Sequence, residues 1–130
     1  MKKMNREIKF RGKNYENKWK YGDLVQEKWK QGKAIMIKKE TTAWSVLEDT
    51  VGQYTGLHDK NGKEIYEGDI VVDKEDEVMG EITWNEEEAS FYFSILYENG
   101  TYEEEKLNDW ASVLEVIGNI YDNPELLGEK

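Results

Sequence analysis

Two short stretches of the sequence place lysines on either side of a tryptophan. They read Lys18-Trp19-Lys20 and Lys28-Trp29-Lys30. Lysines that neutralise phosphates and an aromatic ring that stacks on bases are the chemistry of single-stranded nucleic-acid binding. The same alternation is typical of a two-faced strand whose lysines point to water, and this second interpretation is favoured. The candidate partner-contact residues are Lys18, Trp19, Lys20, Lys28, Trp29 and Lys30.

Other chemistries have little support in the sequence. The chain has no cysteine, and its one histidine, His58, is expected in a loop without a nucleophile beside it. The acidic runs 73–77 and 86–88 offer oxygen ligands for a hard cation. The first run, however, has Val78 where a calcium loop needs its sixth-position glycine, so solvated acidic loops are favoured. The sequence therefore predicts no catalytic residue, no metal, no cofactor and a non-enzymatic protein.

Charge is distributed unevenly along the chain, whose net charge is −10. Residues 1–39 hold 13 of the 18 lysines and arginines against four acids, a net charge of +9, whereas residues 40–130 carry −19. The two signs either interleave on one surface and keep the protein soluble, or they form poles that meet within a subunit or between subunits. In the second case, self-association would weaken with salt.

Length and hydropathy indicate one compact domain, residues 1–130, or two interlocked β subdomains at about 1–49 and 50–130. No apolar run approaches the roughly 20 residues that span a bilayer, and the N-terminus lacks a signal-peptide core. We therefore expect a cytoplasmic protein without membrane contact.

The elements expected around these residues are mostly strands, because apolar residues recur with a period of two. Asn61-Gly62 and Asn99-Gly100 are strong hairpin-turn signals. Asn123-Pro124 is typical of a helix start, so one short C-terminal helix is expected. The strands are expected near 7–11, 19–21, 24–26, 34–37, 45–53, 63–66, 70–72, 80–84, 90–96 and 113–117.

A weak internal similarity links residues 21–25 with residues 66–71. In each, an aromatic residue precedes a Gly-Asp pair and two aliphatic residues. Gly-Asp before an apolar strand is typical of small barrels of the Src-homology-three type. The alternative is that two turns use common turn residues independently.

Four blocks in order resemble the YopX family of small phage and prophage proteins. They are residues 6–12 (REIKFRG), 19–24 (WKYGDL), 50–72, which hold four glycines, and 115–127 (EVIGNIYDNPELL). The departure is His58, where lysine is more usual. The resemblance implies a mainly β architecture with barrel-like elements, a phage-borne origin and homo-oligomers, with the hexamer as one candidate. It implies no catalytic residues.

Two functions follow as hypotheses. The first is a non-enzymatic, self-assembling β module that binds a host or phage protein. The second is a nucleic-acid-associated regulator that uses the basic residues 1–39. A variant of the second is an acidic DNA mimic, which requires the carboxylates of residues 40–130 to line one face.

Overall fold

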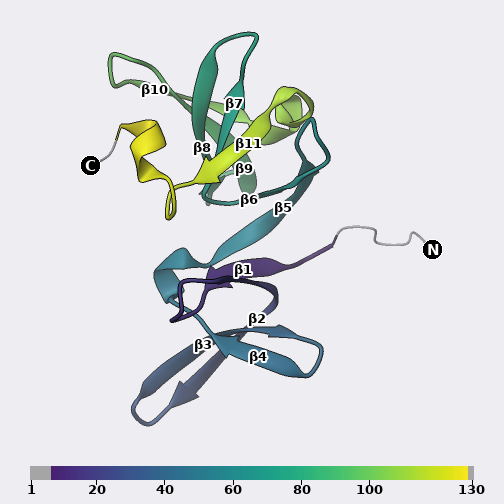
Figure 1. The fold of residues 1–130 in the computed structure, drawn as a ribbon, viewed down its shortest axis with the longest axis vertical. Helices are drawn as coiled ribbons and strands as arrows, with labels where there is room; N and C mark the ends of the chain where they lie inside the picture. The colour runs from purple at the N-terminus through teal and green to yellow at the C-terminus, as the bar shows by residue number, and fades with distance from the viewer. Residues whose placement is uncertain (1–6, 129–130) are drawn as a thin grey trace, which may run out of the picture. The chain divides into compact units, whose positions relative to one another are not determined.

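The fold is described from a computed structural model over residues 7–128. The chain is mainly β and divides into two compact units, residues 1–56 and 57–130. Strand β5 runs across the boundary (Figure 1). The strands belong to two antiparallel sheets, with the orders β4-β3-β2-β1-β5-β6 and β10-β9-β8-β7-β11.

The first unit is built on a long hairpin between β2 and β3, and β1 and β4 extend the sheet on its two sides (Figure 1). The residues of β1 alternate faces, so Arg11 and Lys13 share one face. Its elements are β1 (Phe10–Lys13), β2 (Trp19–Trp29), β3 (Gly32–Lys39), β4 (Thr42–Ser45), the 3₁₀ helix η1 (Glu48–Thr50) and β5 (Gly52–His58).

The second unit is built on a meander of antiparallel strands from β7 to β10, with β11 returning beside β7. Two short 3₁₀ helices, η2 and η3, connect β10 to β11, and a third, η4, follows β11. Its elements are β6 (Glu64–Tyr66), β7 (Asp69–Asp73), β8 (Val78–Asn85), β9 (Ser90–Leu96), β10 (Tyr102–Lys106), η2 (Leu107–Asp109), η3 (Ala111–Val113), β11 (Glu115–Asn119) and η4 (Pro124–Leu127).

Each sheet ends in edge strands, so the described residues form no closed barrel, and the expectation of barrel-like sheets is corrected. The narrower Src-homology-three label is not confirmed. The sequence does not decide between an open sheet and a barrel. Closure depends on pairing between strands that are distant in the chain, and local patterns of residues do not predict that pairing.

The expected C-terminal helix is a four-residue 3₁₀ helix, η4. Pro124 is at its start as predicted, and Gly128 ends it with φ 79°. The Asn123 side chain makes no capping bond to η4. Its Oδ1 instead accepts the backbone N–H of Asn119, 3.3 Å away, which removes the cap that a longer helix would need.

The expected break at Gly22 in the second strand is wrong. β2 continues through Gly22. A Cβ at this position would lie 2.3 Å from the carbonyl oxygen of Lys38 on β3. Glycine therefore permits close strand approach rather than a turn. Gly68 differs, since it has φ 92° and sits in the turn before β7. The two Gly-Asp pairs are thus used independently and form no structural repeat.

The apolar core of the second unit lies on one face of its sheet, beneath the 3₁₀ segments. Its buried members are Ile65, Val71, Ile82, Phe93, Ile95, Leu107, Ala111 and Leu114. The core residues on adjacent strands are cross-strand neighbours, as Ile82 faces Phe93. The buried apolar residues of the first unit are fewer: Ile37, Val46 and Tyr54.

One contact in the second sheet leaves no room for a side chain. A Cβ on Gly80 of β8 would lie 1.9 Å from the carbonyl oxygen of Ser94 on β9. Real Cβ atoms do not approach a backbone oxygen so closely, so this position requires glycine.

Candidate functional site

The structure divides the six predicted contact residues between the two ends of β2. Trp19 begins the strand and Trp29 ends it. Ten residues at about 3.3 Å each separate the two backbone positions by roughly 33 Å along the strand. The two Lys-Trp-Lys stretches therefore form no single site.

The first stretch is part of a set of cation–π contacts. Lys13 of β1 lies opposite Trp19 in the β1–β2 ladder. The Cζ of Arg11 is 4.5 Å and the Nζ of Lys13 is 5.5 Å from the centre of the Trp19 ring. Such contacts stabilise a fold by about 0.5 to 2 kcal/mol each. Trp19 thus has a structural role, and its partners come from β1 rather than from an external ligand.

The flanking lysines of this stretch differ from each other. The Nζ of Lys20 lies 4.7 Å from the centre of the Trp44 ring of β4. Lys18 is exposed just before β2. Lys20 therefore has a structural role within the sheet, whereas Lys18 is exposed to solvent.

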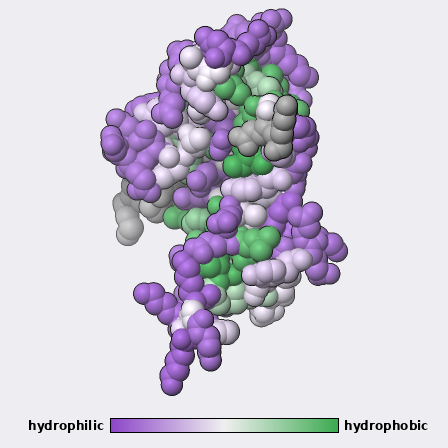
Figure 2. Space-filling view, turned by 90° about the vertical axis from the view of Figure 1, so that its left-hand side faces the viewer, coloured by the Kyte–Doolittle hydropathy of each residue, from purple (hydrophilic) through white to green (hydrophobic). Residues whose placement is uncertain are grey.

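The second stretch forms the tip of the β2–β3 hairpin, and we call Lys28, Trp29, Lys30 and Lys33 the basic tip. Trp29 is 62% exposed, and its indole N–H donates to Glu27 at 3.1 Å. Lys28 lies opposite Lys33 in the ladder, a like-charge pairing that is unfavourable in isolation. Lys33 Nζ also reaches the Glu48 carboxylate at 2.7 Å. In Figure 2, hydrophilic side chains project at the lower end, where this hairpin lies.

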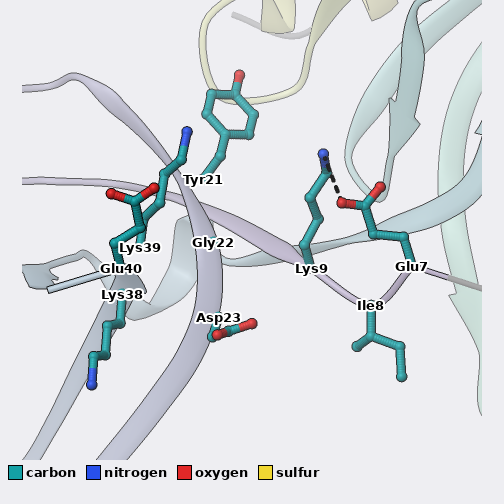
Figure 3. Close-up of a pocket in the computed structure, with 9 residues that line it drawn as sticks. All are labelled: Glu7, Ile8, Lys9, Tyr21, Gly22, Asp23, Lys38, Lys39 and Glu40. Atoms are coloured by element: carbon teal, nitrogen blue, oxygen red, sulfur yellow. Dashed lines mark ion pairs between the residues drawn. The ribbon is translucent and has the colours of Figure 1, made fainter. Parts of the chain in front are cut away.

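A shallow depression of about 340 Å³ opens in the first unit between the segment before β1, the first half of β2 and the end of β3. Its lining mixes both charges, and Lys9 pairs with Glu7 at 3.6 Å. Figure 3 shows the charged side chains pointing in different directions, with Lys38 turned away from Lys9. The arrangement does not converge on a ligand.

A second depression, of about 540 Å³, lies between the β7–β8 and β9–β10 turns of the second unit. We call it the acidic depression. Val78, Leu96 and Tyr97 supply apolar surface, and Asp76, Glu77 and Glu98 supply carboxylates. Tyr97 donates its O–H to Glu103 Oε2 at 2.5 Å, and this hydrogen bond, together with the Glu103 charge, raises the pKa of Tyr97. Apolar surface bordered by acids suits a ligand that is both aromatic or aliphatic and positively charged.

The predicted absence of a metal remains a prediction. Over residues 7–128, no group of three histidine, aspartate or glutamate side chains is placed to hold an ion. His58 was expected in a loop, but it is the exposed last residue of β5. Asp73 instead accepts the backbone N–H of Glu75 at 3.0 Å, which shapes the β7–β8 turn. The structure shows no helix in the described residues that is long and apolar enough to cross a membrane.

Sequence analysis missed the role of Asp59, which is 5% exposed. Its Oδ1 accepts the N–H groups of Asn61 and Lys63 at 2.8 and 2.9 Å, and its Oδ2 accepts the N–H of Val116 at 2.9 Å. Burial on its own would raise the pKa of Asp59, but these three backbone donors and the Lys63 charge lower it. Aspartate two residues before Asn61-Gly62 is a local turn signal. No pattern in the sequence predicts the hydrogen bond that Asp59 accepts from Val116 of β11.

Asn119 organises the other end of β11. Its Oδ1 accepts the N–H groups of Tyr121 and Asp122 at 3.0 and 2.9 Å, and its Nδ2 donates to the Asp122 carboxylate at 3.1 Å. A Cβ on Gly118 would lie 2.5 Å from the Asn123 Oδ1. The side chains of this motif therefore hold a turn.

The third and fourth sequence blocks meet in this part of the second unit. β7 pairs with β11, Lys60 N–H donates to the Leu114 carbonyl at 2.9 Å, and Ile120 N–H donates to the Gly68 carbonyl at 2.9 Å. The ring of Tyr121 lies 3.1 Å from where a Gly68 Cβ would be. The two blocks form one scaffold of backbone contacts.

A protein family and solved structures match this chain. The family described as YopX protein matches residues 9–128. The crystal structure of protein EF1440 from Enterococcus faecalis shares 25% sequence identity and covers 95% of this chain and 99% of that chain, with a TM-score of 0.47. No curated protein matches the chain.

Proposed function

The chain belongs to the YopX family, and from this premise we propose that it is a non-enzymatic β module, of phage or prophage origin, that assembles with itself and binds another protein. Its place of action would be the cytoplasm of a bacterial host. The origin and location rest on the resemblance of the four blocks, and the self-assembly rests on the charges of the two units.

Charge separation between the units is the observation that carries the proposal. Residues 1–56 hold 13 basic residues and seven acids, a net charge of +6. Residues 57–130 hold five basic residues and 21 acids, a net charge of −16. Complementary potentials steer association and fix the register of partners. Each copy thus carries a surface suited to another copy or to a partner of either charge.

Exposed aromatic residues support an interface role. Trp29 of the first unit is 62% exposed and Tyr102 of the second is 64% exposed. Aromatic side chains are enriched at protein interfaces, where a few of them dominate the binding energy.

The non-enzymatic part of the proposal is supported by what the buried polar groups do. Asp59 and Asn119 accept backbone N–H groups as described, and Asp69 accepts the N–H of Tyr66 at 2.7 Å while only 2% exposed. A buried carboxylate or amide whose oxygens already accept backbone N–H groups has a structural role, because a catalytic group must be within hydrogen-bond reach of a substrate.

Size-exclusion chromatography with light scattering tests the self-assembly. At micromolar concentration and about 50 mM salt, we expect a mass several times the 15.3 kDa of one chain, and the hexamer is the proposed form. Raising the salt is expected to lower the mass, because screening weakens exposed charge pairs. A monomer under both conditions would contradict self-assembly, and affinity capture from host cells would then test partner binding alone.

Nucleic-acid binding is a second candidate, and exposed Trp29 with its neighbouring lysines is the observation that favours it. Only one of the two Lys-Trp-Lys stretches presents its ring to solvent, so the site is smaller than the sequence suggested. The acidic DNA mimic is less favoured, because Glu103 and Glu104 are adjacent on β10 and point to opposite faces. A binding assay with DNA and RNA at about 50 mM salt tests the second candidate.

A further inference from the structure

We propose that the basic tip of one copy docks in the acidic depression of a second copy, with the Trp29 ring on the apolar floor. The inference rests on the proposed self-assembly and specifies the two surfaces that meet. Because these surfaces differ, the contact is heterologous, and repetition closes it into a ring or extends it into a filament.

The basic tip has the composition of an interface anchor. Residues 28–33 hold three lysines and no acid. Trp29 is largely exposed at the end of the hairpin, and the Lys28–Lys33 pairing places like charges opposite each other. Lys33 is already paired with Glu48 at 2.7 Å, so an acidic partner would neutralise Lys28 and Lys30 and cover the indole ring.

The acidic depression has the complementary composition. Half-buried Leu96 and exposed Tyr97 provide apolar surface for a ring, and Val78 lies at the edge of the depression, packed against the core. Asp76, Glu77 and Glu98 border this surface, and residues 97–105 hold four acids and no lysine or arginine. Its volume of about 540 Å³ lies within the range of sites that accept molecules larger than an indole ring.

The chemistry of the two surfaces favours a second copy over nucleic acid as the occupant. A net charge of −10 repels a phosphate backbone. Two copies that each carry −10 also repel each other at long range, but salt screens this repulsion beyond about 10 Å, and at contact the lysines of one copy face the carboxylates of the other. Each copy carries one surface of each kind, so no other molecule is needed to satisfy either.

Charge reversal on each side provides the test. In one variant the tip becomes acidic (K28E/K30E), and in the other the depression becomes basic (E77K/E98K). Light scattering should find each variant monomeric, because its own tip and depression now have the same sign. An equimolar mixture should reassemble, since every tip then finds a depression of opposite charge.

Matched controls change the net charge by the same amount elsewhere. K38E/K39E alters the other end of the same hairpin, and E86K/E87K alters the exposed β8–β9 turn. Both controls should assemble like the wild type. Trp29→Ala should raise the dissociation constant of the assembly about 30-fold, as expected for a central aromatic anchor. Circular dichroism should show wild-type secondary structure in every variant.

The outcomes separate this inference from the proposed function. A monomeric wild-type protein would contradict both the proposed self-assembly and the proposed docking surfaces. Reversed variants that assemble like the wild type would overturn the docking surfaces and leave self-assembly standing. Loss of binding to a single-stranded oligonucleotide in K28E/K30E, with assembly unchanged, would assign the basic tip to nucleic acid and overturn the inference.

Discussion

Aromatic rings are used differently in the two units. In the first unit, Trp19 and Trp44 pack against the cations of Arg11, Lys13 and Lys20. In the second unit, Phe93 meets Trp110 edge to face, with ring centres 5.3 Å apart, inside an apolar cluster. The first arrangement packs the buried cations Arg11 and Lys13 and the half-buried Lys20 against half-buried rings, and the second packs rings against other apolar side chains.

This difference predicts where stability and binding lie. Burial of apolar surface contributes about 25 cal/mol per Å², and the second unit has the larger set of buried apolar side chains. We infer that the second unit is the stable scaffold and that the first is the more adaptable unit. Stability should therefore respond most strongly to changes in the second unit.

The largest expected effect is at the centre of that core. Phe93→Ala should reduce the free energy of unfolding by about 3 to 5 kcal/mol, because Phe93 is fully buried and its removal leaves a cavity. Urea-induced unfolding followed by NMR signals of each unit would measure it. Trp29→Ala, an exposed aromatic of the first unit, should change stability little, and a similar loss there would contradict the comparison.

Next in size are the two glycines at which strands approach most closely. Gly80→Ala and Gly22→Ala should each cost about 3 kcal/mol or more, because the new Cβ would overlap a backbone oxygen and the strands must separate. Gly100→Ala is the control. Its φ is 86° but the space around it is open, so it should cost about 1 kcal/mol from backbone strain alone. Thermal unfolding would rank the three.

Asp59→Ala should cost about 2 kcal/mol, since it leaves three backbone N–H groups without their carboxylate acceptor. The pKa of Asp59 is lower in the folded state than its ordinary value of 3.8. Its contribution is therefore fully present above that value and is lost as the pH falls through the lower folded pKa. Unfolding measured from pH 7 to pH 2 should show the wild type and the variant converging only in strong acid. A constant difference down to pH 2 would contradict this role.

The smallest expected effect tests the first unit. Lys20→Met keeps the aliphatic stem but removes the charge above the Trp44 ring, and should cost about 0.5 to 1 kcal/mol. A double-mutant cycle with Trp44→Leu isolates the pair. Lys18→Met, which alters an exposed neighbour, is the control. A coupling energy of zero would mean that the cations of the first unit do not support its sheet.

Local signals in the sequence were sufficient for part of the fold. Asn61-Gly62 forms a turn with Gly62 at φ 83°, and Pro124 begins η4. Features set by pairing between distant strands were not predictable. Whether Trp19 faces a ligand or Lys13 depends on the β1–β2 register, and the strand through Gly22 depends on the approach of Lys38.

The same reason explains what was missed of the candidate sites. The six contact residues were identified by composition, but their division between a structural and an exposed group follows from β1 and β4. The acidic depression brings together Glu77 and Glu98, which are separated by two strands. The period-two pattern predicts that the apolar residues of this depression belong to strands, but it does not predict that they line a depression.

The contact at Gly80 has a consequence for how the chain finds its fold. A two-residue slip of β8 along β9 would keep the apolar face inward, so hydrophobic patterning alone does not reject it. The slip would place a residue with a Cβ at the point where only glycine fits against Ser94. Gly80 therefore selects the native register of β8 on β9, because the shifted pairing would place a Cβ against the Ser94 carbonyl oxygen.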